Sequence, residues 1–196
     1  MIDHHNVVLR LNVMAALIII FCLTVTGCAP LLNTAFKKSL TPMDGEQIVS
    51  GLTQKVTVKR DNMGIPVIEA ANLDDLIFAM GYVSGHDRFT QMEGFRLVGK
   101  GRLSELLGKA TLEMDIYIRS LNLDRAARTL YQSASPELQK MLKLYSDGVN
   151  AYLDKSPLPM TLKLAGYKPE KWDPIDSVYV FLVLTLGLSQ NLHEEI

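Results

Sequence analysis

The side chains best suited to catalysis or to metal binding are few in this sequence, and they are scattered. His86 stands alone, whereas a histidine that acts as a general base needs a positioned partner. No partner is evident from the sequence, so His86 is predicted to be structural or solvated. His193 precedes Glu194 and Glu195, but the second histidine of a zinc-binding helix is missing. The residues therefore predict no catalytic group within this chain and no histidine-rich transition-metal site.

A nucleotide-binding loop and a nucleic-acid partner are both excluded. The stretch from Gly101 to Lys109 superficially resembles a phosphate-binding loop, but that motif needs glycine at position 103 and serine or threonine at position 110. Leu103 and Ala110 stand there instead. The formal net charge is -1 and the isoelectric point is about 6.4. Such a balance provides no basic field that would attract a phosphate backbone.

The start of the chain has the pattern of a secretory signal. A short flank that contains Arg10 precedes an apolar run at residues 13–23, which is shorter than an ordinary transmembrane span. The run leads into small residues and Cys28, an order that resembles the lipobox of bacterial lipoproteins. We therefore expect residues 1–27 to be a lipoprotein signal peptide and Cys28 to carry the lipid. An uncleaved signal anchor is the alternative.

Lipidation of Cys28 would tether the mature chain to a membrane. Ala29 follows the cysteine, and an aspartate at that position is the usual retention signal, so the pattern implies the outer membrane with the chain facing the periplasm. Residues 28–51 lack a sustained apolar period and are expected to form the tether. Cys22 would be lost with the signal peptide, which leaves no partner for an intrachain disulfide.

Regular structure is expected to begin with a β-hairpin. Residues 56–59 alternate apolar and polar side chains, as a half-buried strand does. Asp61, Asn62 and Gly64 supply turn chemistry, and residues 65–69 form the second strand, with Pro66 at its start or on an edge. Two strands do not make a stable sheet alone. The hairpin is therefore predicted to need partner strands that this sequence does not provide.

The remainder is predicted to be helical, which gives a mostly α fold class with one hairpin. Helices are expected at 72–95 with Asn72 as the cap, at 103–107, at about 114–131, at 136–152 after the cap Ser135, and at 177–188. Gly94, Gly99 and Gly101 are expected to break the first helix. The last helix is apolar nearly all round and should lie inside a protein. It runs into the end of the sequence with no closing turn, which suggests truncation.

Several charged residues lie in otherwise apolar stretches, and their role is predicted to be structural. Such charges are tolerated in an interior only as hydrogen-bonded pairs, here holding the hairpin against the helix that follows. Buried ion pairs commonly fix geometry without taking part in a reaction. The residues concerned are Arg60, Asp61, Asp87, Arg88 and Arg102.

The order of short motifs along residues 55–196 is more specific than any single motif. The motifs comprise Arg60, Asp61, Gly64, Ile65 and Pro66; Gly81, Tyr82, Val83, Asp87 and Arg88; Gln91, Met92 and Glu93; Gly101 to Glu105; Asp147, Gly148, Asn150 and Ala151; and Pro169, Glu170, Trp172, Pro174 and Asp176. This succession resembles the α chain of the penicillin acylase family, within the amino-terminal-nucleophile hydrolases. The resemblance implies that residues 52–196 are a truncated α-chain region of an αββα fold, incomplete as given.

The resemblance also implies a reaction that this chain does not perform by itself. In that family a precursor cuts itself and exposes a serine at the amino terminus of a β chain, and this serine attacks the acyl amide of penicillin or of another N-acyl compound such as an acyl-homoserine lactone. The β-chain region of the same precursor is thus the expected partner. By the same resemblance, Glu195 matches a glutamate that coordinates a structural calcium ion. Thr185 and Ser189 match positions that line the acyl pocket.

A hypothesis from a different class competes with the enzymatic one. The chain could be a noncatalytic helical periplasmic lipoprotein that binds a partner through the surface left open beside the hairpin. It predicts a product that is soluble, monomeric and cooperative in unfolding. Exposed strand edges and a wholly apolar helix are liabilities in an independent protein, which favours the enzymatic hypothesis.

Overall fold

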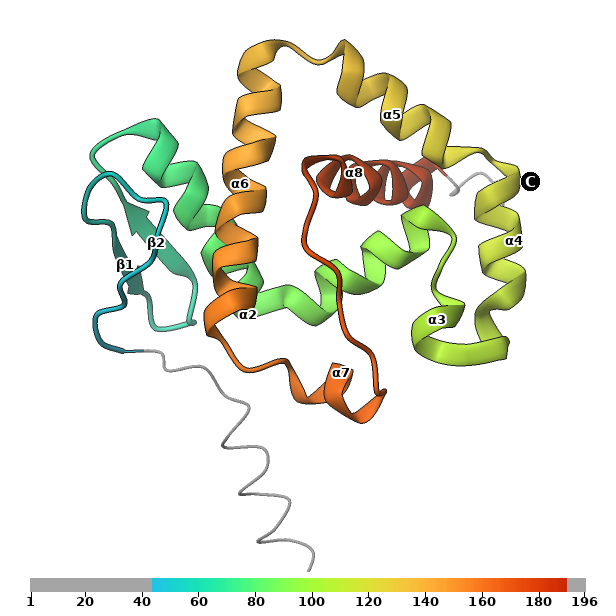
Figure 1. Cartoon of the computed structure of the whole chain (residues 1–196), viewed down its shortest axis with the longest axis horizontal. Helices are drawn as coiled ribbons and strands as arrows, with labels where there is room; N and C mark the ends of the chain where they lie inside the picture. Colours follow the sequence, from blue (N-terminus) through green and yellow to red (C-terminus); the bar gives the residue numbers. More distant parts are fainter. Residues whose placement is uncertain (1–43, 190–196) are drawn as a thin grey trace, which may run out of the picture. The chain divides into compact units, whose positions relative to one another are not determined.

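The computed structural model describes residues 44–189, which pack as one unit of helices and a single two-stranded hairpin, as the fold class predicted (Figure 1). The elements are β1 (Thr57–Arg60), β2 (Pro66–Glu69), α2 (Leu73–Lys100), α3 (Ser104–Leu107), the 3-10 turn η1 (Gly108–Thr111), α4 (Leu112–Ser120), α5 (Leu123–Ser133), α6 (Pro136–Lys155), α7 (Met160–Leu164) and α8 (Pro174–Ser189). Among residues 44–189, no helix has both the length and the apolar character needed to cross a membrane. The predicted signal peptide, Cys28 and Glu195 lie outside the described residues.

The hairpin forms where the alternating pattern predicted it, with the first strand displaced by one residue and the second beginning one residue later than predicted. Its strands are antiparallel, and Val58 pairs with Ile68. Asp61 closes the turn because its Oδ1 accepts hydrogen bonds from the backbone amides of Met63 and Ile65. Gly64 has φ +78°, a conformation that glycine adopts at little cost. Val67 is exposed on the face that it shares with Thr57, Lys59 and Glu69, which are also exposed, so the described residues leave this face of the hairpin uncovered.

An ion pair fastens this hairpin to α2. Arg60 of β1 donates two hydrogen bonds to the carboxylate of Asp87, at 2.7 and 2.9 Å, and a third to the carbonyl of Gly64. The prediction of a charged clasp is confirmed for this pair. It is wrong for Arg102, which pairs with Glu105 and Glu170, and for Arg88, which forms no ion pair with any residue in the range 44–189.

Removing this clasp is expected to cost measurable stability. In a double-mutant cycle of Arg60→Ala and Asp87→Ala, we expect a coupling free energy of about 1–2 kcal/mol, because the pair is doubly hydrogen-bonded and its side chains are only 21% and 22% exposed. The pair Lys59 and Glu69, at 63% and 56% exposure, is the control and should couple by less than about 0.5 kcal/mol. Equal couplings in chemical denaturation would contradict the clasp.

Helix α2 begins at its predicted cap and runs further than predicted. Asn72 accepts a hydrogen bond from the amide of Asp75 through its side chain. Gly94 and Gly99 do not break the helix, which corrects the prediction. Gly99 instead allows close packing, because a Cβ atom there would lie 2.8 Å from the Cβ of Tyr179 on α8. The helix ends at Gly101, whose φ of +60° lets its amide bond back to the carbonyls of Leu97 and Val98.

Asp75, in the first turn of α2, holds the segment that precedes the hairpin. Asp75 is buried, and its carboxylate accepts hydrogen bonds from the amides of Thr53 and Gln54, the hydroxyl of Thr53 and the side-chain amide of Asn72. The Thr53 amide is the largest of the effects that lower the pKa of Asp75. Asp115 has a similar role on α4, where it accepts from the amides of Leu103 and Ser104. Burial raises the pKa of Asp115, but these hydrogen bonds outweigh it and the net shift is downward.

Acid is therefore expected to weaken this protein through Asp75. A carboxyl group whose pKa is lower in the folded state adds stability that is complete above its unfolded pKa of about 3.9 and is lost as pH falls through the folded pKa. The midpoint of thermal unfolding should decline as the pH is lowered below about 4. Asp75→Asn should start from a lower midpoint and decline less steeply. The same acid dependence in both proteins would exclude Asp75 as a source of the effect.

Helices α2 and α6 cross in direct backbone contact (Figure 1). A Cβ atom on Gly81 would lie 2.0 Å from the carbonyl oxygen of Tyr145, and one on Gly148 would lie 1.9 Å from that of Phe78. The two glycines thus bring the helices together from opposite sides of one crossing. Helix α6 starts as predicted, since the hydroxyl of Ser135 accepts a hydrogen bond from the amide of Leu138. Beside the crossing lies the main apolar core: Phe89, Val149, Tyr152, Leu162 and Trp172.

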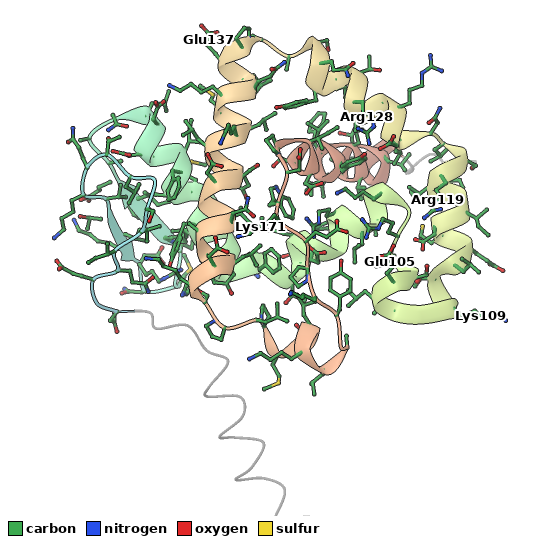
Figure 2. All side chains as sticks on the ribbon, in the orientation of Figure 1. Glu105, Lys109, Arg119, Arg128, Glu137 and Lys171 are labelled. Atoms are coloured by element: carbon green, nitrogen blue, oxygen red, sulfur yellow. The ribbon has the colours of Figure 1, made fainter. Side chains whose placement is uncertain are left out.

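The stretch from residue 112 to residue 133 differs from the single long helix predicted for residues 114–131. It holds two helices, α4 and α5, separated at Asn122, which has φ +56°. Asparagine tolerates this left-handed conformation better than most residues do, so it provides a sharp turn without glycine. Arg119 of α4 also donates to the carbonyl of Gly101 and ties the pair back to the end of α2 (Figure 2).

Helix α8 is the largest departure from the predicted burial. It packs against α2, α5 and α6 (Figure 1). However, the described residues cover only part of its apolar surface: Phe181, Leu184 and Leu188 are exposed, at 60%, 47% and 81%. The prediction that this helix lies inside is therefore wrong for the part of the chain that the structure describes. All three exposed residues lie between the middle of the helix, at Phe181, and its end.

Candidate functional site

A buried charge cluster joins α2 to the start of α8. Arg96 donates from one guanidinium nitrogen to Asp176 at 3.0 Å and from the other to Glu93 at 2.7 Å. Lys100 lies 2.6 Å from the second oxygen of Asp176. Glu93, Arg96 and Asp176 have almost no exposed surface. Two acids and two bases balance, as they must where water is excluded. Burial lowers the pKa of Arg96, but the nearby Glu93 and Asp176 outweigh it and raise that pKa.

The cluster also fixes the loop that leads into α8. Arg96 donates to the backbone carbonyls of Lys171 and Glu170, and its guanidinium lies 5.2 Å from the centre of the Trp172 ring. Asn150 of α6 holds Trp172 by exchanging hydrogen bonds with its backbone amide and carbonyl. Asp176 caps its own helix by accepting from the amide of Asp173. The loop and the first turn of α8 are therefore held by both α2 and α6.

The hydroxyl of Tyr167 adds a further bond to this cluster, and that of Tyr179 holds α8 to α5. Tyr167 donates to Glu93 at 2.7 Å. Tyr179 donates to Asp124 of α5. Burial, reinforced by the neighbouring carboxylate, raises the pKa of both phenols, so both remain protonated donors at neutral pH. The first half of α8 is thus bonded to α2 and to α5.

From Phe181 to its end at Ser189, α8 presents a continuous outer face. Residues spaced by three or four positions on a helix lie on the same side. By this spacing Phe181, Leu184 and Leu188 share one face with Thr185 and Ser189, and all five are exposed. The structure thus places both predicted pocket residues on the uncovered apolar side of α8. It does not bring them near the charge cluster, which lies at the opposite end of the helix.

The hydroxyl groups on this face donate to backbone carbonyls of α8 itself. Thr185 donates to the carbonyl of Phe181 at 2.9 Å, and Ser189 donates to that of Leu186 at 2.8 Å. Such bonds to the preceding turn are common for serine and threonine within helices. Both hydroxyl protons are therefore used within α8. The outer face is consequently more apolar than the residue types suggest, and it suits contact with a hydrocarbon group.

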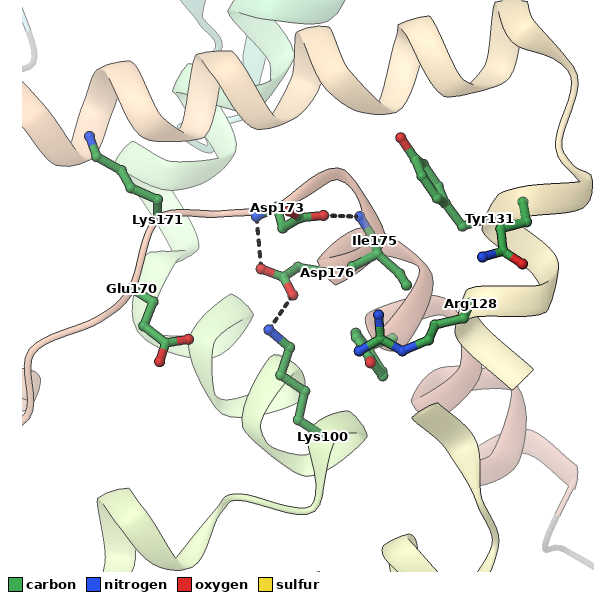
Figure 3. Close-up of a pocket in the computed structure, with 10 residues that line it drawn as sticks. Lys100, Arg128, Tyr131, Glu170, Lys171, Asp173, Ile175 and Asp176 are labelled. Atoms are coloured by element: carbon green, nitrogen blue, oxygen red, sulfur yellow. Dashed lines mark hydrogen bonds and ion pairs between the residues drawn. The ribbon is translucent and has the colours of Figure 1, made fainter. Parts of the chain in front are cut away.

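Two cavities lie elsewhere in the described part of the chain. One, of about 460 Å³, lies beside the charge cluster, and Lys100 reaches Asp176 at its wall (Figure 3). It is lined by cations and acids in equal number, with Arg128 and Tyr131 on the side of α5. The other, of about 570 Å³, lies between the hairpin, the segment before it and α2, and is mainly apolar. Neither cavity includes Thr185 or Ser189.

His86 lines the second cavity, and its setting corrects the sequence analysis. A partner was not evident from the sequence, but Nδ1 of His86 lies 2.8 Å from Oδ1 of Asp87. Neighbours in a helix do not normally face each other. Here the backbone departs from helical geometry at Arg88, where φ is -135° and ψ is 15°. The bonded His86 is a structural companion of the clasp between Arg60 and Asp87.

The described residues contribute little to a metal site. Within the range 44–189, no group of three or more histidine, cysteine, aspartate or glutamate side chains could hold a metal ion. The buried acids Glu93 and Asp176 are already neutralised by Arg96 and Lys100. Glu195 and Cys28 lie outside the described residues, so their expected roles stay predictions.

Arg96 and Lys100 are the residues that the sequence analysis missed. The buried stripe of α2 passes through Phe89, and positions four, seven and eight residues further on carry Glu93, Arg96 and Leu97. A glutamate and an arginine on a stripe that should be apolar signal a buried pair. Their partner Asp176 is 80 positions beyond Arg96 in the sequence. Only the packing of α8 against α2 reveals that pairing.

Comparison with known proteins supports one family. A family model described as penicillin amidase matches residues 55–196. The acyl-homoserine lactone acylase QuiP of Pseudomonas aeruginosa is 44% identical over 176 residues, which cover 89% of this chain and 21% of that protein. The penicillin acylase 2 proenzyme of Pseudomonas sp. (strain SE83) is 38% identical over 153 residues, or 78% of this chain and 20% of that protein.

A solved structure agrees with these relatives. A thermostable penicillin G acylase from Alcaligenes faecalis matches with a TM-score of 0.62 and 25% sequence identity. The match covers 70% of this chain and 75% of the compared chain. By contrast, the chain spans only about a fifth of the length of the curated relatives named above.

Proposed function

The chain belongs to the penicillin amidase family, and on that basis we propose that it is the amino-terminal part of an amidohydrolase that cleaves the acyl amide of an N-acyl substrate. The family resemblance drawn from the motifs of residues 55–196 is confirmed. The relatives are named as acylases of acyl-homoserine lactones and of penicillin. We take these two compound classes as the candidate substrates.

The observation that carries the proposal is the outer face of α8. Phe181, Leu184 and Leu188 expose a large apolar surface, and Thr185 and Ser189 lie among them with their hydroxyl protons turned inward. A contiguous apolar patch on a protein surface commonly marks a site that binds a ligand or a partner. We propose that this face forms one wall of the pocket for the acyl group. Its apolar character, with one aromatic and two aliphatic side chains, favours a hydrocarbon group over a strongly polar acyl group.

The nucleophile of the proposed reaction lies outside this chain. By the family resemblance it is a serine at the amino terminus of a β-chain region of the same precursor, with its own α-amino group as the base. An α-amino group titrates at about 7.7–8.0, so it is partly neutral near pH 7.5 and can accept the serine proton. The hydroxyl then attacks the acyl carbonyl, and backbone donors stabilise the oxyanion. We assign no catalytic residue to residues 44–189.

Three further proposals concern residues outside the described range. We propose that residues 1–27 are removed as a signal peptide and that Cys28 carries a lipid that anchors the protein to the outer membrane, facing the periplasm. We also propose that Glu195 contributes a carboxylate to a structural calcium site, because hard cations prefer oxygen ligands. Within residues 44–189, no group of three or more histidine, cysteine, aspartate or glutamate side chains could form such a site without Glu195.

The test is to express the complete reading frame that contains this chain and to measure amine release from a panel of acyl amides. The panel should hold acyl-homoserine lactones of increasing chain length, a phenylacetylated penicillin and a penicillin with an aliphatic acyl group. We expect hydrolysis of an amide with an aliphatic acyl chain. Absence of hydrolysis across the panel, in a protein that is correctly folded and processed, would overturn the proposed function.

A further inference from the structure

We infer that Arg96 is a positioning residue for the acyl-binding face of α8, acting through Asp176; the inference rests on the function proposed above. Arg96 lies on α2 and contacts neither Thr185 nor Ser189. Its contacts are all with Glu93, the loop that enters α8 and the first turn of α8. Any effect on the acyl pocket must therefore travel along α8 itself.

The guanidinium group of Arg96 bonds three parts of the chain at once: α2, the loop before α8 and the first turn of α8. One nitrogen bonds Asp176 at 3.0 Å and the carbonyl of Lys171 at 3.1 Å, while the other bonds Glu93 at 2.7 Å. The planar fork of an arginine fixes direction as well as distance. Because these groups are buried, water does not compete for the bonds. The cluster therefore determines the direction in which α8 leaves its loop.

Within the described residues, the hydrogen bonds and ion pairs that anchor α8 to other helices all lie in its first half. Its first half is held by Arg96 and Lys100, by the bond from Tyr179 to Asp124, and by the close approach of Tyr179 to Gly99. The stretch from Phe181 to the end of α8 carries the exposed Phe181, Leu184 and Leu188, and its packing against α2 is apolar, with Val183 beside Gly99. A helix anchored in this way behaves as a lever, in which the anchored end sets the position of the free end.

Because α8 is long, a small rotation at its anchored end moves its far end by a larger distance. At about 1.5 Å per residue, Ser189 lies about 20 Å along the helix from Asp176, so a rotation of about 5° at the anchor moves it by nearly 2 Å. A displacement of about 1 Å between a substrate and its catalytic groups can reduce a rate about 100-fold. A change at Arg96 should therefore alter how the acyl chain fits against Thr185 and Ser189.

The variant Arg96→Lys separates positioning from charge. Lysine keeps the positive charge, so the cluster still balances Glu93 and Asp176. Its single ammonium group lacks the fork that reaches Asp176, Glu93 and the carbonyl of Lys171 together. We choose Arg60→Lys as the matched control, because Arg60 also bonds a carboxylate with its fork, that of Asp87, and a backbone carbonyl, that of Gly64, but bonds neither α8 nor the loop before it. Lys100→Gln is a milder second variant, which withdraws one contact from Asp176.

The experiment measures kcat and KM of the full-length enzyme for aliphatic acyl amides of increasing chain length, well below the unfolding midpoint of each variant. For Arg96→Lys we expect kcat/KM for the preferred chain to fall about 10- to 100-fold and the preference among chain lengths to flatten. Lys100→Gln should shift the profile in the same direction by less. Arg60→Lys should keep the wild-type profile even if its unfolding midpoint falls.

The outcomes separate this inference from the proposed function. A wild-type enzyme that hydrolyses no member of the panel overturns both. If the wild type is active and Arg96→Lys lowers activity equally for every chain length, as a loss of folded enzyme would, the positioning role is wrong and the function stands. Should Arg96→Lys fail to fold, the profile of Lys100→Gln decides: an unchanged preference overturns the inference, and a flattened one supports it.

Discussion

Gly148→Ala is expected to prevent normal folding, with a loss of at least about 4 kcal/mol in the free energy of unfolding. The added methyl group would lie 1.9 Å from the carbonyl oxygen of Phe78 and 2.8 Å from the amide nitrogen of Tyr82. Both are backbone atoms of α2, so no side-chain rotation relieves the overlap. Alanine gains at most about 1 kcal/mol in helix propensity over glycine, which is too little to offset the separation of two helices.

Gly94→Ala is the matched control for that prediction. Gly94 lies within α2, and a Cβ atom there would have no heavy atom within 4 Å. We expect this variant to keep the wild-type stability or to gain up to about 1 kcal/mol. The measurement is soluble yield together with the midpoint of thermal unfolding. If Gly148→Ala unfolds within a few degrees of the wild type, the backbone contact between α2 and α6 is wrong.

Local chemistry explains which parts of this fold could be predicted from the sequence. Asn72 and Ser135 both cap helices as predicted, because capping depends only on residues three positions away. The turn at Asp61 and Gly64 is equally local. Gly99 was misread, since its effect comes from Tyr179 on another helix. A glycine that breaks a helix and one that admits a neighbour look identical until the neighbour is known.

The same distinction, between local effects and contacts with residues distant in the sequence, applies to the candidate site. Thr185 and Ser189 were found through family resemblance and lie on one exposed face, as residues four apart in a helix must. The burial of α8 was predicted from its apolar composition alone, but composition does not say which residues supply the covering surface. The cluster around Arg96 escaped notice because its pairs join residues 3 and 80 positions apart. The longer of these pairings exists only in the packed chain.

Asp176→Ala is expected to lose about 3–5 kcal/mol of stability, because it removes one member of a buried and balanced set of charges. Lys100 would lose its 2.6 Å partner, and Arg96 would be left with Glu93 as its only carboxylate. The change also removes the acceptor that caps the amide of Asp173. A buried cation without a partner costs far more than the net contribution of the intact pair, so the loss reflects the group left behind.

An aspartate-to-alanine change in an exposed ion pair shows how much of the stability loss at Asp176 depends on burial. Asp147 lies 2.6 Å from Lys143 in an ion pair whose side chains are 66% and 42% exposed, and Asp147→Ala should change stability by less than about 0.5 kcal/mol. Asp176→Asn should fall between the two alanine variants, since the amide keeps an oxygen for the Asp173 cap but loses the charge. Denaturant unfolding at neutral pH measures all three. Equal, small effects of the two alanine variants would mean that water reaches the cluster. The buried guanidinium would then hold α8 no more firmly than a surface pair does, and the lever assigned to Arg96 would lose its anchor.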